Sequence, residues 1–304
     1  MEKPDVLVLM STYNGEKYLE AQVQSILNQE NVNVTLLIRD DGSKDSTLDI
    51  LNRLQSTHQN IKVLSEPNKG SAQSFFRLLR ISADLNFQYY CLSDQDDIWE
   101  PQKLDRAVSF LKNSADTPAL YCSNLKVVDS DLNFVRMMNK PGTFPDKDTS
   151  LLKNIVTGCT AVMNRKFIEL FNSLPIPQKA VMHDWWLYCL ACYFGNIIYD
   201  QEAFIKYRQH SANVYGARSN SWGSRLKGLN SSIKNSEKEH YRETQAREFI
   251  NLIGDSLPTK DRETINLIAN YRESLINRLK IALNFKQFKK ISVRLRIRIL
   301  LGLV

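Results

Sequence analysis

The chain lacks the features that would send it into or across a membrane. None of its apolar runs approaches the roughly 18–20 residues that a membrane-spanning helix needs. Its first residues, Met1 to Asp5, are too acidic for a secretory signal, and the apolar run after them is too short. We therefore expect a cytoplasmic protein. Its 304 residues suffice for one large α/β domain with an extension, or for two modest domains.

Cysteine is scarce. The chain has five, an odd number, and they lie among apolar residues. This pattern favours small buried hydrophobes in a reducing environment over a disulfide framework. Cys189 and Cys192 have the C-x-x-C spacing, but they lie in a helix-like segment without a second pair or a nearby histidine knuckle to complete a zinc site, which disfavours metal or redox use. The other cysteines are Cys91, Cys122 and Cys159.

Acidic residues are absent from the last stretch, Asn277 to Val304, which carries eight Lys or Arg residues. The formal net charge of the chain is +7, and the surplus belongs to residues 221–304, of which this stretch is the end. Interleaved apolar side chains would let the tail lie on an anionic bilayer surface. The alternation in Arg294 to Ile299 also fits a strand or a contact with a protein partner. Nucleic acid is the poorer explanation, because no binding module is recognisable.

The first half of the chain alternates strand-like and helix-like stretches. Val6 to Met10 is a continuous apolar run, as expected of a strand buried on both faces, and apolar positions in 19–27 recur at helical spacing. The alternation predicts an α/β fold whose central sheet is mainly parallel and flanked by helices. A short strand is expected over 204–208, and long helices over 237–253 and 259–282. No G-x-G-x-x-G follows the first strand, which disfavours a dinucleotide-dependent oxidoreductase.

Acidic clusters follow two of these strands. Asp40 and Asp41 come after the strand of 34–38, and Asp94, Asp96 and Asp97 come after the apolar run of 89–93. In open parallel sheets ligands bind at the carboxyl ends of the strands, so these side chains should meet at one edge. Carboxylates suit Mg²⁺ or Mn²⁺, and such an ion would let an acidic site accept a diphosphate. An acidic turn that solvates a strand end is the structural alternative.

Three motifs, in this order and spacing, resemble those of inverting family 2 glycosyltransferases with the GT-A (Rossmann-like) fold. They are residues 11–19 (STYNGEKYL), 39–47 (RDDGSKDST) and 93–99 (SDQDDIW). With 158–160, 183–185 and 207–213 added, the chain is most similar to the rhamnosyltransferase branch that builds bacterial cell-surface polysaccharides. The resemblance covers roughly residues 4–218. We therefore expect a GT-A domain over 1–218 and a helical, basic extension over 219–304 that contacts the membrane surface.

The resemblance implies a nucleotide-sugar donor, dTDP- or UDP-linked. It places Ser11, Thr12 and Tyr13 beside the nucleoside, and it makes Asp41 the acceptor of the hydrogen bond from the pyrimidine N3–H. A carboxylate only accepts hydrogen bonds, so it favours thymine or uracil over cytosine. A turn followed by a helix cap is the structural alternative for residues 40–43.

The resemblance also puts Lys69 and Gly70 in a loop that lines the donor site, and Asp94 on the ribose or diphosphate side. It assigns Asp96 to a divalent cation, Mn²⁺ or Mg²⁺. His210 matches a position that approaches the metal or the diphosphate, although a lone histidine after a strand is often structural.

Asp184 matches the catalytic base of the family. Inversion is a single displacement, so one carboxylate must take the proton of the acceptor hydroxyl as the bond forms. Many members of the family have Glu directly before this Asp. Here His183 takes that place, as a histidine does in the rhamnosyltransferase-like branch. Trp185 and Trp186 offer an apolar platform to a sugar ring, or pack the helix into the core.

Together these features predict an inverting, metal-dependent transfer of L-rhamnose from dTDP-L-rhamnose. The acceptor would be a growing, lipid-linked cell-surface polysaccharide at the inner face of the cell membrane. A UDP-hexose-dependent enzyme of the same fold is the alternative. An oxidoreductase, or a non-catalytic carbohydrate or nucleic-acid binding module, explains fewer of the acidic motifs.

Overall fold

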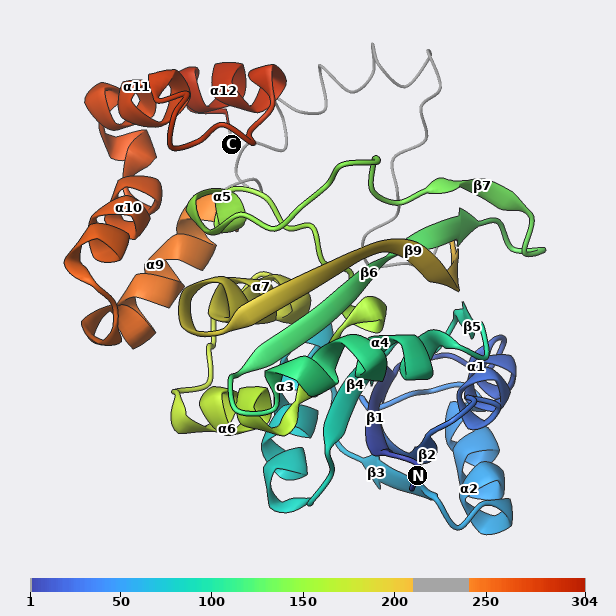
Figure 1. Ribbon diagram of the computed structural model, residues 1–304. Coiled ribbons are helices and arrows are strands. Elements are labelled where there is room, and N and C mark those ends of the chain that lie inside the picture. The colour runs from blue at the N-terminus through green and yellow to red at the C-terminus, as the bar shows by residue number, and fades with distance from the viewer. Residues whose placement is uncertain (1, 210–240, 304) are drawn as a thin grey trace. The chain divides into compact units, whose positions relative to one another are not determined.

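The computed structural model describes residues 2–209 and 241–303, and the chain divides into two compact units (Figure 1). The first unit comprises residues 1–145, 155–176 and 182–210. The second comprises residues 146–154, 177–181 and 211–304. Two short segments of the central chain thus belong with the C-terminal helices.

A nine-stranded sheet forms the centre of the first unit, in the order β3-β2-β1-β4-β8-β6-β9-β5 with β7 paired to β6. Strand β1 (Asp5–Thr12) pairs in parallel with β2 (Asn33–Asp40) and with β4 (Tyr89–Ser93). Strand β2 pairs in parallel with β3 (Ile61–Ser65). This half of the sheet confirms the expected parallel arrangement.

The other half of the sheet adds antiparallel pairs. Strand β8 (Val162–Asn164) runs antiparallel to β4 and to β6 (Ala119–Val128), whereas β6 and β9 (Asn196–Arg208) are parallel. The short strands β5 (Ile98–Trp99) and β7 (Phe134–Met137) pair antiparallel with β9 and β6.

Strand β9 is longer than the short strand expected over 204–208. Its register against β6 shifts, because Ser123 pairs with Asp200 while Asn124 pairs with Ala203. The exposed residues Gln201 and Glu202 fall in this irregularity, and they interrupt the apolar pattern that would have marked the strand in the sequence.

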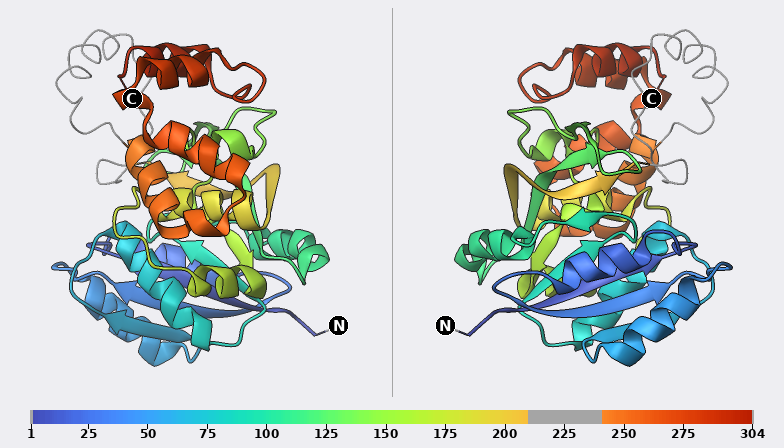
Figure 2. Two further views of the ribbon diagram at one scale, coloured as in Figure 1. Left: turned by 90° about the vertical axis from the view of Figure 1, so that its left-hand side faces the viewer. Right: turned by 90° about the vertical axis from the view of Figure 1, so that its right-hand side faces the viewer.

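Helices cover both faces of the parallel half (Figures 1 and 2). Helices α1 (Leu19–Leu27) and α2 (Thr47–Thr57) lie on one face, and α3 (Ser71–Ile81) lies on the other. Val6, Val8 and Met10 of β1 belong to the same buried cluster as apolar residues of α1, α2 and α4 (Lys103–Leu111). The alternate residues of β1 are buried too, which explains its unbroken apolar run.

Two further helices complete this unit. Helix α6 (Arg165–Ser173) and helix α7 (His183–Phe194) both contact α3. Asn164 caps α6 by accepting a hydrogen bond from the Phe167 amide. Helix α7 carries Cys189 and Cys192, and its residues from His183 to Ala191 are all buried.

The second unit is helical in its described part. It contains α5 (Lys147–Ser150), α9 (Tyr241–Ile253), α10 (Thr259–Ala269), α11 (Leu275–Leu283) and α12 (Val293–Leu300). Ion pairs of Lys147 with Asp261 and of Lys290 with Asp146 hold residues 146–154 to these helices. No helix in residues 2–209 or 241–303 has both the length and the apolar character that crossing a bilayer requires.

One expectation for this unit is wrong, and the strand considered as an alternative for 294–299 is excluded. The single helix over 259–282 is broken at 270–274, because Ser274 accepts a hydrogen bond from the Asn277 amide and starts a new helix there. The period-two alternation of Arg294 to Ile299 does not form a strand. Ser292 caps helix α12 through the Leu295 amide, and a helix follows.

Candidate active site

The ends of three parallel strands bring the sequence motifs to one edge of the sheet. Thr12 of β1 is in register with Asp40 of β2, and Met10 of β1 is in register with Ser93 of β4. Ser11 and Thr12, Asp40 and Asp41, and the loop from Asp94 to Asp97 therefore leave the sheet on the same side. This is the edge at which α/β sheets place their ligands.

A buried ionic network surrounds Asp41. Arg39, which is 1% exposed, donates to Asp41 Oδ1 at 2.5 Å and to Glu66 Oε2 at 2.8 Å. The amides of Lys69 and Gly70 donate to Asp41 Oδ1 and Oδ2, each at 2.8 Å. The loop of 69–70 is thus fastened to Asp41 through its main chain. In residues 2–209 and 241–303 only the Gly70 amide donates to Oδ2, so a lone pair of this oxygen can accept from a further donor.

Asp40 has a different role from its neighbour. Its carboxylate accepts hydrogen bonds from Thr12 Oγ1 at 3.2 Å, from Ser43 Oγ at 2.5 Å, and from the amides of Gly42 and Ser43. These contacts close a turn after β2 and fix Thr12 to it. The structural role considered for residues 40–43, a turn before a helix, therefore applies to Asp40, whereas Asp41 points into the network of Arg39.

Ser11 and Tyr13 flank this network. Ser11 Oγ lies 2.6 Å from Ser74 Oγ, and Ser74 Oγ also accepts from Arg39 at 2.9 Å. Tyr13 is 44% exposed, and its main chain is clamped by the Gln95 side chain, which accepts from the amide at 2.8 Å and donates to the carbonyl at 3.0 Å. A Cβ on Gly15 would lie 2.2 Å from Gln95 Oε1, so glycine there makes room for the clamp.

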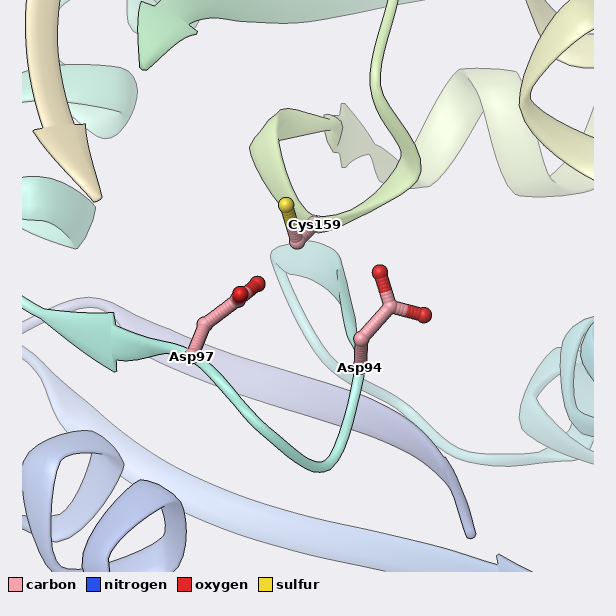
Figure 3. A group of neighbouring side chains, drawn as sticks. All are labelled: Asp94, Asp97 and Cys159. Atoms are coloured by element: carbon pink, nitrogen blue, oxygen red, sulfur yellow. The ribbon is translucent and has the colours of Figure 1, made fainter. Parts of the chain in front are cut away.

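The acidic loop after β4 gathers candidate metal ligands (Figure 3). Ligand atoms of Asp94, Asp97 and Cys159 all lie within 4.8 Å of one another. Both carboxylates rise from the same loop, beneath the turn that carries Cys159. Asp96 is not in this group, but its charge acts on both neighbours. Burial, and then the charges of Asp96 and Asp184, raise the pKa of Asp94 to about 7.

A divalent cation fits the chemistry of this loop. Asp97 Oδ2 is buried and has no hydrogen-bond partner among the described residues, which is costly unless a ligand takes it up. Burial and the charges of Asp96 and Asp94 raise the pKa of Asp97 well above its usual value. Clustered carboxylates with raised pKa values are stabilised by positive charge, and oxygen donors suit Mg²⁺ and Mn²⁺.

Two residues at the end of β9 support the acidic loop, and sequence reasoning gave neither a role. The buried Arg208 donates from Nε to the Asp96 carbonyl at 3.0 Å, and its amide donates to Asp97 Oδ1 at 3.2 Å. Burial, and then the charges of Asp94 and Asp97, raise the pKa of Tyr207, so its hydroxyl stays protonated beside the loop. Their only sequence signal is the motif of 207–213.

Asp184 lies at the first turn of α7 and is only 7% exposed. Its Oδ2 accepts from the Gly158 amide at 3.1 Å, and its Oδ1 accepts from the Trp185 amide at 2.6 Å. Gly158 and Cys159 belong to one 3-10 turn, Gly158–Thr160. This turn therefore touches Asp184 with one residue and the acidic loop with the next.

His183 is buried beside Asp184, and its imidazole makes no hydrogen bond to the described part of the chain. Its ring stacks on Phe75, with the ring centroids 3.9 Å apart, and both nitrogens are without a partner among the described residues. Burial lowers the pKa of His183 to about 3, so the imidazole is neutral at physiological pH. A Cβ on Gly158 would lie 2.5 Å from His183 Nε2.

The other residues that the sequence singled out differ in their exposure to solvent. Trp185 and Trp186 are 8% and 1% exposed, which suits core packing better than an open sugar platform. The side chain of Lys69 is exposed. His210 lies outside the described residues.

The family model described as "Glycosyl transferase family 2" matches residues 7–171. Over 219 residues the chain is 33% identical to "dTDP-rhamnosyl transferase RfbG" of Shigella flexneri, and the match covers 68% of this chain and 74% of that protein. Over 218 residues it is 30% identical to the "UDP-Glc:alpha-D-GlcNAc-diphosphoundecaprenol beta-1,3-glucosyltransferase WfgD" of Escherichia coli, covering 69% of this chain and 79% of the relative.

Solved structures resemble the fold at lower identity. A crystal structure of S. aureus TarS 1-349 in complex with UDP aligns with a TM-score of 0.56 at 17% identity, over 95% of this chain and 76% of that one. The mannosyltransferase PcManGT from Pyrobaculum calidifontis, in complex with GDP-Man and Mn²⁺, aligns with a TM-score of 0.55 at 15% identity, over 99% and 80%. The likeness confirms the GT-A fold with its helical C-terminal extension.

Proposed function

The chain belongs to glycosyl transferase family 2, and from that premise we propose that it transfers L-rhamnose from dTDP-L-rhamnose to a growing cell-surface polysaccharide, with inversion at the anomeric carbon. The donor follows the name of the S. flexneri relative. One observation carries the proposal: the turn of Gly158–Thr160 contacts Asp184 through Gly158 and the acidic loop through Cys159. Two acidic groups about ninety residues apart in sequence thereby share one site.

Asp184 acts as the general base. The acceptor hydroxyl attacks the anomeric carbon from the face opposite the nucleoside diphosphate, and a positioned carboxylate removes its proton as the new bond forms. The amides of Gly158 and Trp185 each hold one oxygen of Asp184, so the carboxylate is oriented before the substrates arrive. No second carboxylate is needed as a nucleophile.

The base of the nucleotide binds beside Asp41. This carboxylate is fixed by Arg39 and by the amides of Lys69 and Gly70, and its remaining acceptor position would take the N3–H of thymine or uracil. Ser11, Thr12 and Tyr13 border the same strand end. Asp94 would face the ribose or the diphosphate.

A divalent cation, Mn²⁺ or Mg²⁺, would bind at the acidic loop, held by Asp94 and Asp97, whose ligand atoms lie close together, and by Asp96, which the family resemblance assigns to the metal. When bound, such an ion offsets the charge that builds on the departing diphosphate. The PcManGT structure contains Mn²⁺, which supports the same use here. Arg208 keeps the loop in place by donating to the Asp96 carbonyl. His210 remains a proposed further contact to the metal or diphosphate.

We place the acceptor on a lipid carrier at the cytoplasmic face of the cell membrane. The name of the E. coli relative specifies a diphosphoundecaprenol-linked acceptor, and the name of a Bacillus subtilis relative specifies teichuronic acid biosynthesis. Peripheral contact through the basic tail would bring the enzyme to such a substrate. A UDP-hexose donor is the second candidate, since the E. coli relative is named for UDP-Glc and a carboxylate at Asp41 accepts either pyrimidine.

The test is donor hydrolysis and transfer across a panel of nucleotide sugars, with and without Mn²⁺. dTDP-L-rhamnose should be turned over fastest, and Asp184→Asn should lower turnover by about 10²–10⁴ while donor binding stays near normal. Asp49→Asn, an exposed acid on α2, is the matched control and should change neither. Faster turnover of a UDP-hexose would replace the donor assignment. Full turnover by Asp184→Asn would place the base elsewhere.

A further inference from the structure

Helix α11 exposes a stripe of large apolar side chains. Leu275, Ile276, Leu279 and Leu283 are between 39% and 64% exposed. At about 100° per residue they fall within one arc of roughly 100° on the helix. Lys280 lies at the border of this arc, and it is exposed as well. A stripe of this width is what a helix normally buries against a partner.

Helix α12 repeats the pattern. Val293, Ile297 and Leu301, the last just beyond the helix end, are 70%, 51% and 62% exposed and share an arc of about 80°. Arg294 and Arg298 border it. Phe285, in the link between the two helices, is 62% exposed.

These stripes are not the inner faces of loosely packed helices, because each helix already buries its other side. Ile281 of α11 and Ile299 of α12 are fully buried. Arg296 is 5% exposed and donates to the carbonyls of Ala282 at 2.7 Å and Phe288 at 2.5 Å, which joins the two helices. Each helix thus has one face that is packed and a second apolar face that remains exposed.

Beyond Glu273, which pairs with Arg247, the charge along the stripes has a single sign. From Asn277 to Val304 the sequence contains no acidic residue. Within the described residues, Lys280, Lys286, Lys289 and Arg294 form no ion pair. A protein partner, or a second copy of this helix pair, would place like charges together unless it supplied acids, whereas an anionic lipid surface offers both acyl chains and negative headgroups.

We propose that α11 and α12 form a membrane-docking surface that lies on an anionic bilayer, with its apolar stripes at acyl-chain level and its lysines and arginines among the headgroups. This deepens, and rests on, the proposed use of a lipid-linked acceptor. The exposed apolar residues add a hydrophobic contribution that salt does not screen. Binding to the bilayer should therefore weaken as salt is added but not disappear. The helix pair is therefore an interfacial anchor that does not cross the membrane.

Flotation of the full-length protein with vesicles tests the proposal. Vesicles of phosphatidylglycerol and phosphatidylcholine should carry the protein upward, and vesicles of phosphatidylcholine alone should carry at least tenfold less. Ile276→Ser combined with Ile297→Ser should lower binding to the anionic vesicles by about tenfold or more, and so should Lys286→Glu combined with Lys289→Glu. Phe134→Ser, at a position of β7 in the first unit that is 62% exposed, is the matched control and should bind as the wild type does.

Hydrolysis of a soluble nucleotide sugar separates this inference from the proposed reaction. All four proteins should hydrolyse the donor equally, because none of the changed residues belongs to the candidate active site. Equal flotation of the wild type and both double variants would overturn the membrane assignment. Concentration-dependent dimerisation that disappears in the Ile276→Ser, Ile297→Ser protein, without vesicle binding, would overturn it in favour of a second copy. Loss of hydrolysis by the wild type itself would count against the proposed function alone.

Discussion

Replacing Gly158 by alanine should displace the candidate base, Asp184, without changing that residue itself. The added Cβ would lie 2.5 Å from His183 Nε2, whereas ordinary van der Waals contacts begin at 3.4 Å. The imidazole must therefore move by about 1 Å relative to the turn. It cannot swing aside easily, because it is buried and stacked on Phe75 at 3.9 Å. Much of the displacement should pass to the start of α7 and to the turn itself.

The same displacement reaches Asp184 by two routes. Asp184 follows His183 in the chain, and its Oδ2 accepts a hydrogen bond from the Gly158 amide at 3.1 Å. A misplacement of about 1 Å near the reacting groups lowers a rate by roughly 10²-fold, so we expect kcat for sugar transfer to fall by about that factor. Overpacking should also lower the free energy of unfolding by about 1–3 kcal/mol.

The assay is steady-state transfer or donor hydrolysis, combined with urea unfolding. Gly254→Ala is a control in the second unit, where the new Cβ would lie 2.9 Å from Ile250 Cδ1, the free end of a side chain that can move aside; it should change stability little and leave kcat unchanged. His183→Ala completes a double-mutant cycle, and Gly158→Ala combined with His183→Ala should be no slower than His183→Ala alone. If Gly158→Ala turns over within twofold of the wild type while the chain is folded, the coupling of this turn to Asp184 is refuted.

Three further predictions use the ionisable groups of the same unit. Burial lowers the pKa of His183 in the folded protein to about 3, so below about pH 6.5 only the unfolded chain takes up a proton there and the free energy of unfolding falls. At pH 5 this loss should be about 2 kcal/mol, and the free energy of unfolding of His183→Asn in urea should depend less on pH between 7.5 and 5. Because burial and like charge raise the pKa of Asp94 to about 7, Mn²⁺ affinity should rise about tenfold from pH 6 to pH 8 with release of a proton, measurable by calorimetry in two buffers, and a pH-independent affinity would exclude Asp94 as the titrating group. Asp41→Asn removes a buried partner of Arg39 and should cost about 3 kcal/mol in urea unfolding, whereas Glu20→Gln, in an ion pair of which both members are more than half exposed, should cost under about 1 kcal/mol.

Local patterns in the sequence were sufficient to predict the parallel half of the sheet. The run of Val6 to Met10 and the helical spacing of 19–27 each belong to one element, and burial of both faces of β1 leaves a signal that a single window contains. The acidic motifs were found for a similar reason, because each follows directly on its strand. The register of Thr12 with Asp40 then brings them together.

What the sequence could not predict depends on partners that are distant in the chain. Gln95 clamps Tyr13 across 82 residues, and Arg208 reaches the carbonyl of Asp96 across 112. Neither contact leaves a local trace, since a glutamine in a loop and an arginine after a strand are both ordinary on a surface. Ser274 is a different case, because its contact with the Asn277 amide is local. Apolar spacing continues on either side of Ser274 and masks the break in the long helix expected over 259–282.

The acidic loop that would bind the donor and the cation destabilises the empty protein, because its carboxylates are buried close to one another. Asp94 and Asp97 sit where burial and neighbouring carboxylates disfavour their charged forms, and Asp97 Oδ2 has no partner among the described residues. Hydrogen bonds from Arg208 fix the loop in that arrangement at a cost to folding. Binding of positive charge relieves the cost, so part of the affinity for a cation comes from strain already present in the protein. Asp97→Asn should consequently raise the stability of the metal-free protein while weakening its response to Mn²⁺, an opposition that a merely structural Asp97 would not produce.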